Sequence, residues 1–245
     1  MKRLRVFAGP NGSGKSTIIQ VVKDAGVHLG TYVNADDYKK EINANHSFRF
    51  SELGISWSKK DFIEAYKHAG KLYSQSDGER LVSLLTFNEQ GFSLPTDCMV
   101  NDYFTSFLAD YVRRHLLECS VKFTFETVMS HPSKLDFIRQ AHDAGYKVYL
   151  YFVSLSDPTL NENRVQQRVR MGGHDVPAEK IRERYYRTMD LLIDAIHLSD
   201  KVYIFDNSYS GPKLFARVEN DTLSIDEEVD FVPTWFKTYV LDKLE

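Results

Sequence analysis

Apolar and polar positions alternate along the chain in a pattern that predicts strands separated by helices. Short apolar runs typical of strands lie at residues 3–8, 31–34, 121–126, 147–153 and 202–206. Stretches with apolar residues at helical spacing lie at residues 15–25, 100–118, 132–144, 157–171 and 177–198. The run at 147–153 is almost continuously apolar, which predicts a strand buried on both faces. This order predicts an α/β fold with a parallel sheet, right-handed crossovers and helices on both faces.

Residues 40–100 depart from this alternation. Their pattern is mixed, with helical spacing at 58–75 and 77–90 and interruptions at Gly91 and Pro95. We therefore expect a helical insertion there, on the substrate side of the fold.

The last part of the chain predicts a different local structure. Residues 213–218 and 222–225 flank a polar turn, which predicts a β-hairpin, and a short amphipathic helix follows Pro233. Because no repeat, low-complexity tract or linker divides the chain, we expect a single domain over residues 1–245.

Composition and charge narrow the class of protein. The 245 residues are 42% hydrophobic and 27% charged, which is typical of a globular protein and excludes a disordered one. The net charge of −3 gives no general attraction to nucleic acid or anionic membranes, so we expect neither as a partner. No apolar run is long enough for a membrane span. Cys98 and Cys119 lack the spacing of metal ligands and predict reduced thiols in the cytoplasm.

The predicted strand at 3–8 runs directly into a glycine-rich segment of the form G-x-x-x-x-G-K-S. After a strand and before a helix, this pattern is the P-loop that binds nucleotide phosphates. Its glycines let backbone N–H groups point at the phosphates, and the following helix adds its positive end. Lys15 would reach the β- and γ-phosphates, and the Ser16 hydroxyl would ligate Mg²⁺. The residues expected to bind nucleotide are Gly9, Pro10, Asn11, Gly12, Ser13, Gly14, Lys15, Ser16 and Thr17.

Two carboxylates, Asp36 and Asp37, follow the second predicted strand. Asp36 would accept the proton of a substrate hydroxyl during phosphoryl transfer, and Asp37 is the competing candidate. Either residue could instead cap the helix that follows, and taken alone the capping role is favoured.

A second acidic position, Glu126, ends the strand at 121–126 and is followed by Thr127. Glu126 could ligate Mg²⁺ through water or hold a substrate hydroxyl, and the Thr127 hydroxyl would face the same crevice. Capping of the helix after Pro132 is an equally good interpretation of Glu126. In a parallel sheet, Asp36 and Glu126 would both lie at the carboxyl ends of strands, where ligands bind.

Basic residues outnumber acidic ones by seven to three between residues 164 and 187. Arg164 and Arg168 lie four apart and therefore on one face of a predicted helix. Such arginines neutralise the charge of a phosphoryl group in transfer. The alternative is a solvated helix face laced with Glu179 and Glu183, which would be favoured if this signal stood alone.

The segment between the two predicted helices reads Gly172-Gly173-His174. Two glycines allow a sharp and mobile connection, as in a lid over a nucleotide. His174 could contact phosphate or be a structural histidine of the turn. The apolar strand at 147–153 is followed by Ser154 and not by the Asp of a Walker B motif, which favours a small kinase over a motor ATPase.

Taken together, these motifs resemble the zeta-toxin family of P-loop kinases. The motifs that carry the resemblance are the P-loop, Asn34-Ala35-Asp36, Phe125-Glu126-Thr127, Arg164-Val165-Gln166-Gln167-Arg168-Val169, Gly172-Gly173-His174, Arg184-Tyr185 and Asp206-Asn207-Ser208. The resemblance implies a kinase that uses ATP or GTP with Mg²⁺ and phosphorylates a hydroxyl of a sugar nucleotide such as UDP-N-acetylglucosamine.

The resemblance also implies roles for single residues. Asp36 would be the catalytic base, while Lys15 with Ser16 would bind phosphate and Mg²⁺. Glu126, with Thr127, would hold the substrate, and Arg164 with Arg168 would bind the phosphates. An antitoxin protein is implied as a partner.

Two other functions are compatible with the motifs. The first is a P-loop kinase with another acceptor, such as a nucleoside, an antibiotic hydroxyl or a polynucleotide end. The second is a non-catalytic switch that uses nucleotide to order the Gly172-Gly173 segment.

Overall fold

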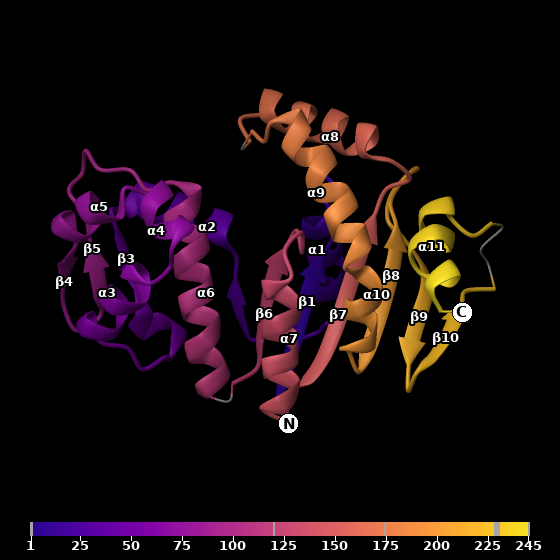
Figure 1. Ribbon diagram of the computed structural model, residues 1–245, viewed down its shortest axis with the longest axis horizontal. Helices are drawn as coiled ribbons and strands as arrows, with labels where there is room; N and C mark the ends of the chain where they lie inside the picture. Colours follow the sequence, from indigo (N-terminus) through magenta and orange to yellow (C-terminus); the bar gives the residue numbers. More distant parts are fainter. Residues whose placement is uncertain (1, 120, 174, 228–230, 245) are drawn as a thin grey trace. The chain divides into compact units, whose positions relative to one another are not determined.

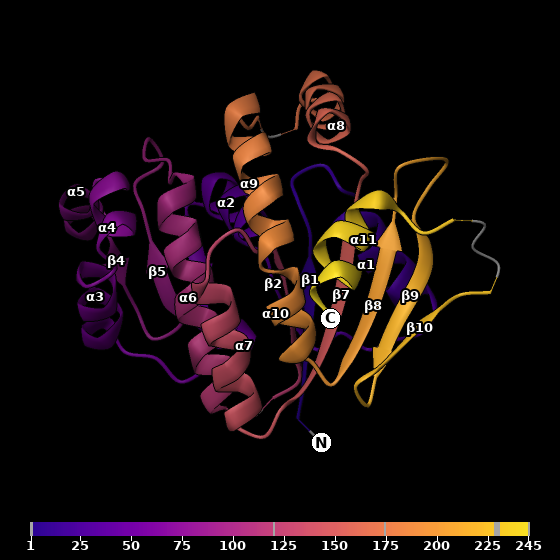
Figure 2. The ribbon, with the colours of Figure 1, turned by 45° about the vertical axis from the view of Figure 1, so that its right-hand side comes forward.

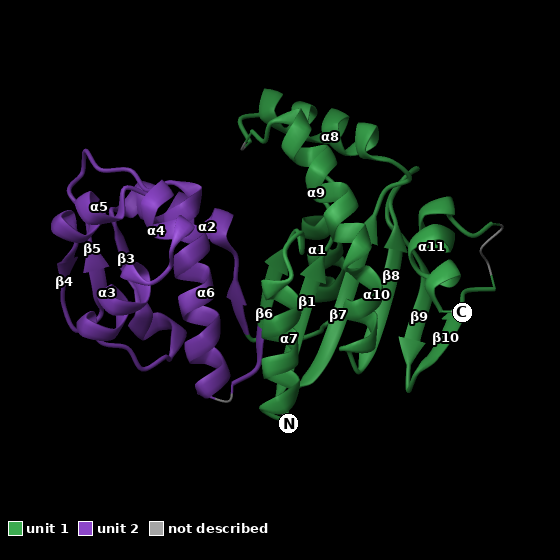
Figure 3. Ribbon diagram, in the orientation of Figure 1, with its two compact units in different colours: residues 1–30, 124–245 green, residues 31–123 purple. Residues whose placement is uncertain are grey.

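The computed structural model describes residues 2–119, 121–173, 175–227 and 231–244. The chain divides into two compact units, one of residues 1–30 and 124–245 and one of residues 31–123 (Figure 3). The P-loop belongs to the first unit, and Asp36 belongs to the second.

The first unit is built on a sheet whose strands lie in the order β10-β9-β8-β7-β1-β6. These strands are β1 (Arg3–Ala8), β6 (Phe123–Thr127), β7 (Lys147–Ser154), β8 (Lys201–Asp206), β9 (Lys213–Glu219) and β10 (Thr222–Ile225). β7 is parallel to β1 and to β8, whereas β9 and β10 are antiparallel additions at one edge. The predicted α/β fold and the predicted C-terminal hairpin are therefore confirmed.

The helices of the first unit lie on both faces of its sheet, as predicted. They are α1 (Lys15–Asp24), α7 (Ser133–Asp143), α8 (Pro158–Arg170), α9 (Ala178–Asp190), α10 (Leu192–His197), α11 (Thr234–Tyr239) and the short 3₁₀ helix η2 (Leu241–Lys243). In Figure 1, α7 and α10 lie in front of the strands and α1 lies behind them. The helix predicted over 177–198 is divided into α9 and α10 at Leu191.

Aromatic packing sets the register of the central strands. Phe7, Tyr151 and Tyr203 are register partners on β1, β7 and β8. Their rings stack with centroids 4.6 Å apart for the first pair and 4.9 Å apart for the second. Because stacked rings add to the burial of their large apolar area, this row stabilises the alignment of the three strands, and the P-loop begins at the end of β1. β7 is buried on both faces from Leu150 to its end, as its apolar run predicts.

The second unit combines helices with short strands. Its elements are β2 (Thr31–Val33), α2 (Ala35–Asn45), β3 (Ser47–Arg49), the 3₁₀ helix η1 (Phe50–Leu53), α3 (Lys59–Lys67), α4 (Lys71–Gln75), α5 (Gly78–Leu84), β4 (Thr86–Phe87), β5 (Gly91–Ser93) and α6 (Asp102–Glu118). Strands β3, β5 and β4 form an antiparallel sheet in that order. Fully buried phenylalanines from several of these elements, among them Phe50, Phe62 and Phe104, form its core.

The predicted helix over 77–90 is wrong at its end. α5 stops at Leu84, and Phe87 pairs with Phe92 in the β4–β5 hairpin. The cause is the turn at Asn88, whose Oδ1 accepts hydrogen bonds from the backbone N–H groups of Gln90 and Gly91. An asparagine that bonds to the backbone two and three residues on favours a turn over a helix.

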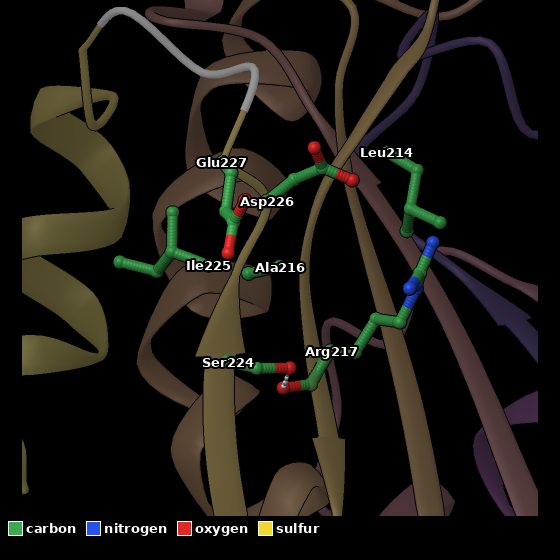
Figure 4. A pocket seen from close by; sticks show the side chains of 7 residues that line it. All are labelled: Leu214, Ala216, Arg217, Ser224, Ile225, Asp226 and Glu227. Atoms are coloured by element: carbon green, nitrogen blue, oxygen red, sulfur yellow. Dashed lines mark hydrogen bonds between the residues drawn. The ribbon is translucent and has the colours of Figure 1, made fainter.

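A hollow of about 370 Å³ lies on the β9–β10 hairpin (Figure 4). Leu214, Ala216 and Arg217 of β9 line it together with residues 224–227. No residue of the P-loop lines this hollow, so it is not the predicted nucleotide site. Among the helices of the described residues, none is both long enough and apolar enough to cross a membrane.

Candidate phosphate-binding site

The P-loop connects β1 to α1, and its backbone depends on glycine. Gly9, Gly12 and Gly14 have φ angles of 148°, 73° and 101°, a region that side chains with a Cβ rarely adopt. A Cβ on Gly9 would lie 2.1 Å from the carbonyl oxygen of Val153. The glycines of the motif therefore let the loop curl closely over the end of β7.

Lys15 is held at the base of this loop. Its Nζ donates to the carbonyl oxygens of Gly9 at 2.9 Å and Pro10 at 3.0 Å, and it lies 3.9 Å from Oε1 of Glu126. Lys15 is only 8% exposed. A buried ammonium needs such partners. The P-loop carbonyls and Glu126 of β6 together hold the side chain of Lys15 in place.

Glu126 and Thr127 stand at the end of β6 in different environments. Glu126 faces Lys15 and does not cap α7, whose N-cap is Pro132 without a side-chain hydrogen bond. The capping alternative for Glu126 is therefore wrong. The Thr127 hydroxyl accepts a hydrogen bond from the N–H of Met129 at 3.0 Å, which shapes the turn that leaves the strand.

Helix α8 and the end of β8 brace the P-loop from behind. Asn161 Nδ2 donates to the carbonyl oxygen of Asn11 at 2.6 Å, and Asn207 Nδ2 donates to that of Ser13 at 2.8 Å. Arg164 Nη2 in turn donates to the carbonyl oxygen of Asn207 at 2.6 Å. Both asparagines are almost completely buried. The three side chains join the loop, the helix and the strand into one site.

The two predicted phosphate arginines have different surroundings. Arg164 contacts the loop after β8 through one of its five N–H donors. Arg168 lies one turn further along α8, where its carbonyl oxygen accepts from the N–H of Gly173 at 2.9 Å. A Cβ on Gly173 would lie 2.5 Å from Cγ of Arg168, so this glycine is needed for the close turn. His174 lies outside the described residues.

Part of the basic excess between 164 and 187 is neutralised by ion pairs. Arg182 binds both carboxylate oxygens of Glu162, a residue that is only 7% exposed, and Arg187 pairs with Glu183. Val165, Val176 and Ile181 form a small core between α8 and α9. The two helices thus pack as a hairpin, and α8 lies beyond the carboxyl ends of β1 and β8 (Figures 1 and 2). Arg187 therefore fits the solvated-face interpretation through its pair with Glu183, whereas Arg182 joins α9 to α8 through Glu162.

Tyr185 fixes α9 to the sheet. Its hydroxyl donates to the carbonyl oxygen of Leu155, just after β7, at 2.9 Å. Burial raises the pKa of Tyr185 well above its ordinary value, so the hydroxyl stays protonated and remains a donor.

Asp36 and Asp37 belong to the second unit, in the first turn of α2. The N-cap of that helix is Asn34, whose Oδ1 accepts from the N–H groups of Asp36 at 2.8 Å and Asp37 at 3.4 Å. The favoured capping role of these aspartates is therefore wrong, because the preceding asparagine already fills it. Both carboxylates are exposed.

The residues present fit a Mg²⁺ ion that arrives with the nucleotide. Ser16 is exposed in the first turn of α1, beside Lys15. Among the described residues, no group of three or more His, Cys, Asp or Glu side chains could hold a metal ion. Asp206, which ends β8, accepts instead from Trp235 Nε1 at 2.7 Å and from the N–H of Ser208 at 2.9 Å. The phosphates would therefore have to supply most of the ligands.

Sequence reasoning missed Asn161 and assigned no role to Asn207. Asn161 sits on the buried face of a predicted helix, where a polar residue is a weak signal for a partner. Asn207 was only part of the motif Asp206-Asn207-Ser208. The structure shows why position 14 must be glycine: a Cβ there would lie 2.2 Å from Asn207 Nδ2. That requirement is the trace which Asn207 leaves in the P-loop motif.

Comparison with known proteins agrees with this geometry. Residues 96–211 match the model of the family described as zeta toxin, which confirms the predicted resemblance. That range contains Glu126, Asn161, Arg164 and Asn207, and the P-loop precedes it. The search of curated proteins found no match.

Solved structures with similar folds include two of the AvrRxo1-ORF1:ORF2 complex, one with ATP and one with sulphate ions. They are 17% identical, with TM-scores of 0.56 and 0.55, and cover 92% and 93% of this chain. A structure from the PezAT chromosomal toxin-antitoxin system of Streptococcus pneumoniae is 12% identical over 84% of this chain and 67% of its own length, with a TM-score of 0.46. At 17% identity the likeness establishes the fold, and this chain covers 61% to 62% of the length of the matched chains of that complex.

Proposed function

We propose that the protein, whose residues 96–211 match the model of the zeta toxin family, is a kinase that transfers the γ-phosphate of ATP or GTP to a hydroxyl of a sugar nucleotide such as UDP-N-acetylglucosamine. The observation that carries the proposal is the position of Lys15, held within a curled P-loop by two carbonyl oxygens and 3.9 Å from Glu126. A loop with this shape would receive the phosphates of a nucleotide without rearrangement.

The charges of the first unit suit phosphoryl transfer. Lys15 and the N-terminal end of α1 would bind the β- and γ-phosphates, and Arg164 with Arg168 would approach them from α8. Fixed positive groups in a site with little water stabilise the charge that spreads over the transferred group. Mg²⁺, bound through the phosphates and Ser16, would supply further neutralisation of that charge.

The acceptor would be activated and held by carboxylates. Asp36, exposed and with no capping role, would take the proton of the acceptor hydroxyl, while Glu126 with Thr127 would bind the acceptor. An antitoxin partner and a cytoplasmic location belong to the same proposal.

A substrate panel tests this function. The purified protein is incubated with radiolabelled ATP or GTP, Mg²⁺ and a set of sugar nucleotides, with nucleosides and oligonucleotides as other acceptors. Transfer to UDP-N-acetylglucosamine, lost in the Asp36→Asn variant, would support the proposal. Tight ATP binding without transfer to any sugar nucleotide would reject the acceptor class.

A further inference from the structure

Two buried asparagines face the backbone of the P-loop at its crest. Asn207, after β8, donates to the carbonyl oxygen of Ser13, and Asn161, in α8, donates to that of Asn11. They approach from elements that are distant in sequence, and neither contacts the loop through a charged group. Their effect on the loop is therefore one of orientation and not of attraction.

Each of these hydrogen bonds fixes the direction of a whole peptide group. No peptide bond of the described residues is cis, and in a trans peptide the C=O and the N–H point in opposite directions. When the carbonyl of Asn11 turns toward Asn161, the N–H of Gly12 must face the other way. In the same manner, the bond from Asn207 to Ser13 directs the N–H of Gly14 away from Asn207.

These two N–H groups are the donors that a phosphate cradle needs. Neither Gly12 N nor Gly14 N donates to another group within the part of the chain that the structure describes. The carbonyls of Gly9 and Pro10 are turned inward to Lys15. The carbonyl oxygens of Gly9, Pro10, Asn11 and Ser13 are thus occupied, while the N–H groups of Gly12 and Gly14 are available for an anion.

Space at the glycines agrees with this arrangement. A Cβ on Gly14 would lie 2.2 Å from Asn207 Nδ2, and one on Gly12 would lie 2.7 Å from the carbonyl oxygen of Asn161. The bracing residues therefore occupy the space that larger side chains would need. Arg164 completes the brace, because its Nη2 donates to the carbonyl oxygen of Asn207.

We propose that Asn207 and Asn161 are positioning residues of the phosphate site, which hold the Ser13 and Asn11 carbonyls outward so that the Gly12 and Gly14 N–H groups point at the phosphates. This inference rests on the proposed nucleotide binding and deepens it. Removal of either amide lets the peptide rotate, and the cradle then loses a donor.

Variants of the two asparagines test the proposal in the full chain. Asn207→Ala and Asn161→Ala are compared with Asn163→Ala, an exposed asparagine on the same helix. Binding of ATP and of inorganic tripolyphosphate is measured by calorimetry. Since a lost hydrogen bond costs about 1 to 3 kcal/mol when its partner stays buried, we expect each variant to bind both probes roughly 5- to 150-fold more weakly, and Asn163→Ala to bind as the wild type.

Two results would overturn the proposal. One is ATP affinity within twofold of the wild type in both asparagine variants. The other is weaker binding of ATP with unchanged binding of tripolyphosphate, which would place Asn207 and Asn161 at the base and not at the phosphates. If Asn207→Ala does not fold, Asn207→Leu keeps the approximate shape of the side chain and removes the donor without adding a charge.

A spectroscopic reading separates this proposal from the function on which it rests. The amide signals of Gly12 and Gly14 in the protein without nucleotide should shift in both variants and remain in place in Asn163→Ala. Unchanged signals would overturn the positioning role even if no nucleotide binds. Shifted signals in a protein that binds neither ATP nor tripolyphosphate would instead support the positioning role and reject the nucleotide site.

Discussion

The ammonium of Lys15 lies 3.9 Å from the carboxylate of Glu126, although 111 residues separate them in the chain (126 − 15). One residue opens α1 and the other lies near the end of β6. The sheet thus places an acidic group beside the cation expected to meet the phosphates. A carboxylate in this position gives the buried ammonium a partner of opposite charge.

Replacement of Lys15 by methionine should abolish most phosphoryl transfer. The variant keeps the length of the side chain but removes the charge and the two hydrogen bonds to Gly9 and Pro10. Loss of one preorganised donor to a developing charge typically lowers kcat by about 100- to 1000-fold. Steady-state transfer assays measure this, with Lys23→Met, on the exposed side of α1, as the control. Equal losses in both variants would contradict the assigned role.

Replacement of Asp36 by asparagine should remove transfer and leave ATP binding unchanged. The carboxylate is exposed and does not cap α2, because Asn34 does. The exchange therefore removes a base without removing a structural contact. Asp37→Asn is the matched control, one position further in the same helical turn. Full activity of Asp36→Asn together with loss of activity in Asp37→Asn would assign the base to Asp37.

Replacement of Gly14 by alanine should destabilise the protein more than the same exchange at Gly26. Both glycines have positive φ, 101° and 76°, so both exchanges carry the backbone cost of about 1 to 2 kcal/mol. Only at Gly14 would the new Cβ collide, 2.2 Å from Asn207 Nδ2, whereas nothing lies within 4 Å at Gly26. Urea unfolding of the two variants measures the difference. Equal free energies of unfolding would mean that the side chain of Asn207 moves away from the new Cβ without loss of stability.

The free energy of unfolding should fall between pH 10 and pH 12 in part because of Tyr66. Burial raises the pKa of Tyr66 to about 12, while its hydrogen bond with Ser76 acts in the opposite direction. The raised pKa means that the fold favours the neutral phenol. This stability is fully present below the unfolded value of 10.0 and is lost as the pH rises toward 12.

Tyr66→Phe provides the comparison for that pH dependence. The variant lacks the ionisable group, so its unfolding free energy should fall less steeply between pH 10 and pH 11.5 than that of the wild type. Urea unfolding at several pH values measures the slopes. Identical slopes would show that Tyr66 does not contribute.

The sequence alone predicts the parts of the fold that depend on local pattern. The P-loop, the doubly buried strand β7 and the C-terminal hairpin each have a short, periodic signal, and each is confirmed. The hairpin at Thr86–Phe87 was missed because two residues are too few for a period, and only the side chain of Asn88 marks the turn.

The candidate site was predictable where a fixed spacing of residue types is typical of a single function. The spacing of Gly9, Gly14 and Lys15 identifies the loop without any structure. The hydrogen bonds from Asn161 and Asn207 to that loop were not predictable. The sequence does not show which backbone carbonyl a buried amide will meet in the folded chain. The capping role given to Asp36 failed for a similar reason, since Asn34 competes for the same backbone N–H groups.

The contact between Trp235 and Asp206 gives the protein an optical reporter. The indole N–H of Trp235 donates to the carboxylate one residue before Asn207, and the only other tryptophan, Trp57, belongs to the second unit. In a Trp57→Phe variant, Trp235 would be the only tryptophan left, so a change in its fluorescence on addition of ATP would report binding near Asn207, and a titration would follow occupancy without label or coupling enzyme. A C-terminal helix far from the loop in sequence thereby makes nucleotide binding visible.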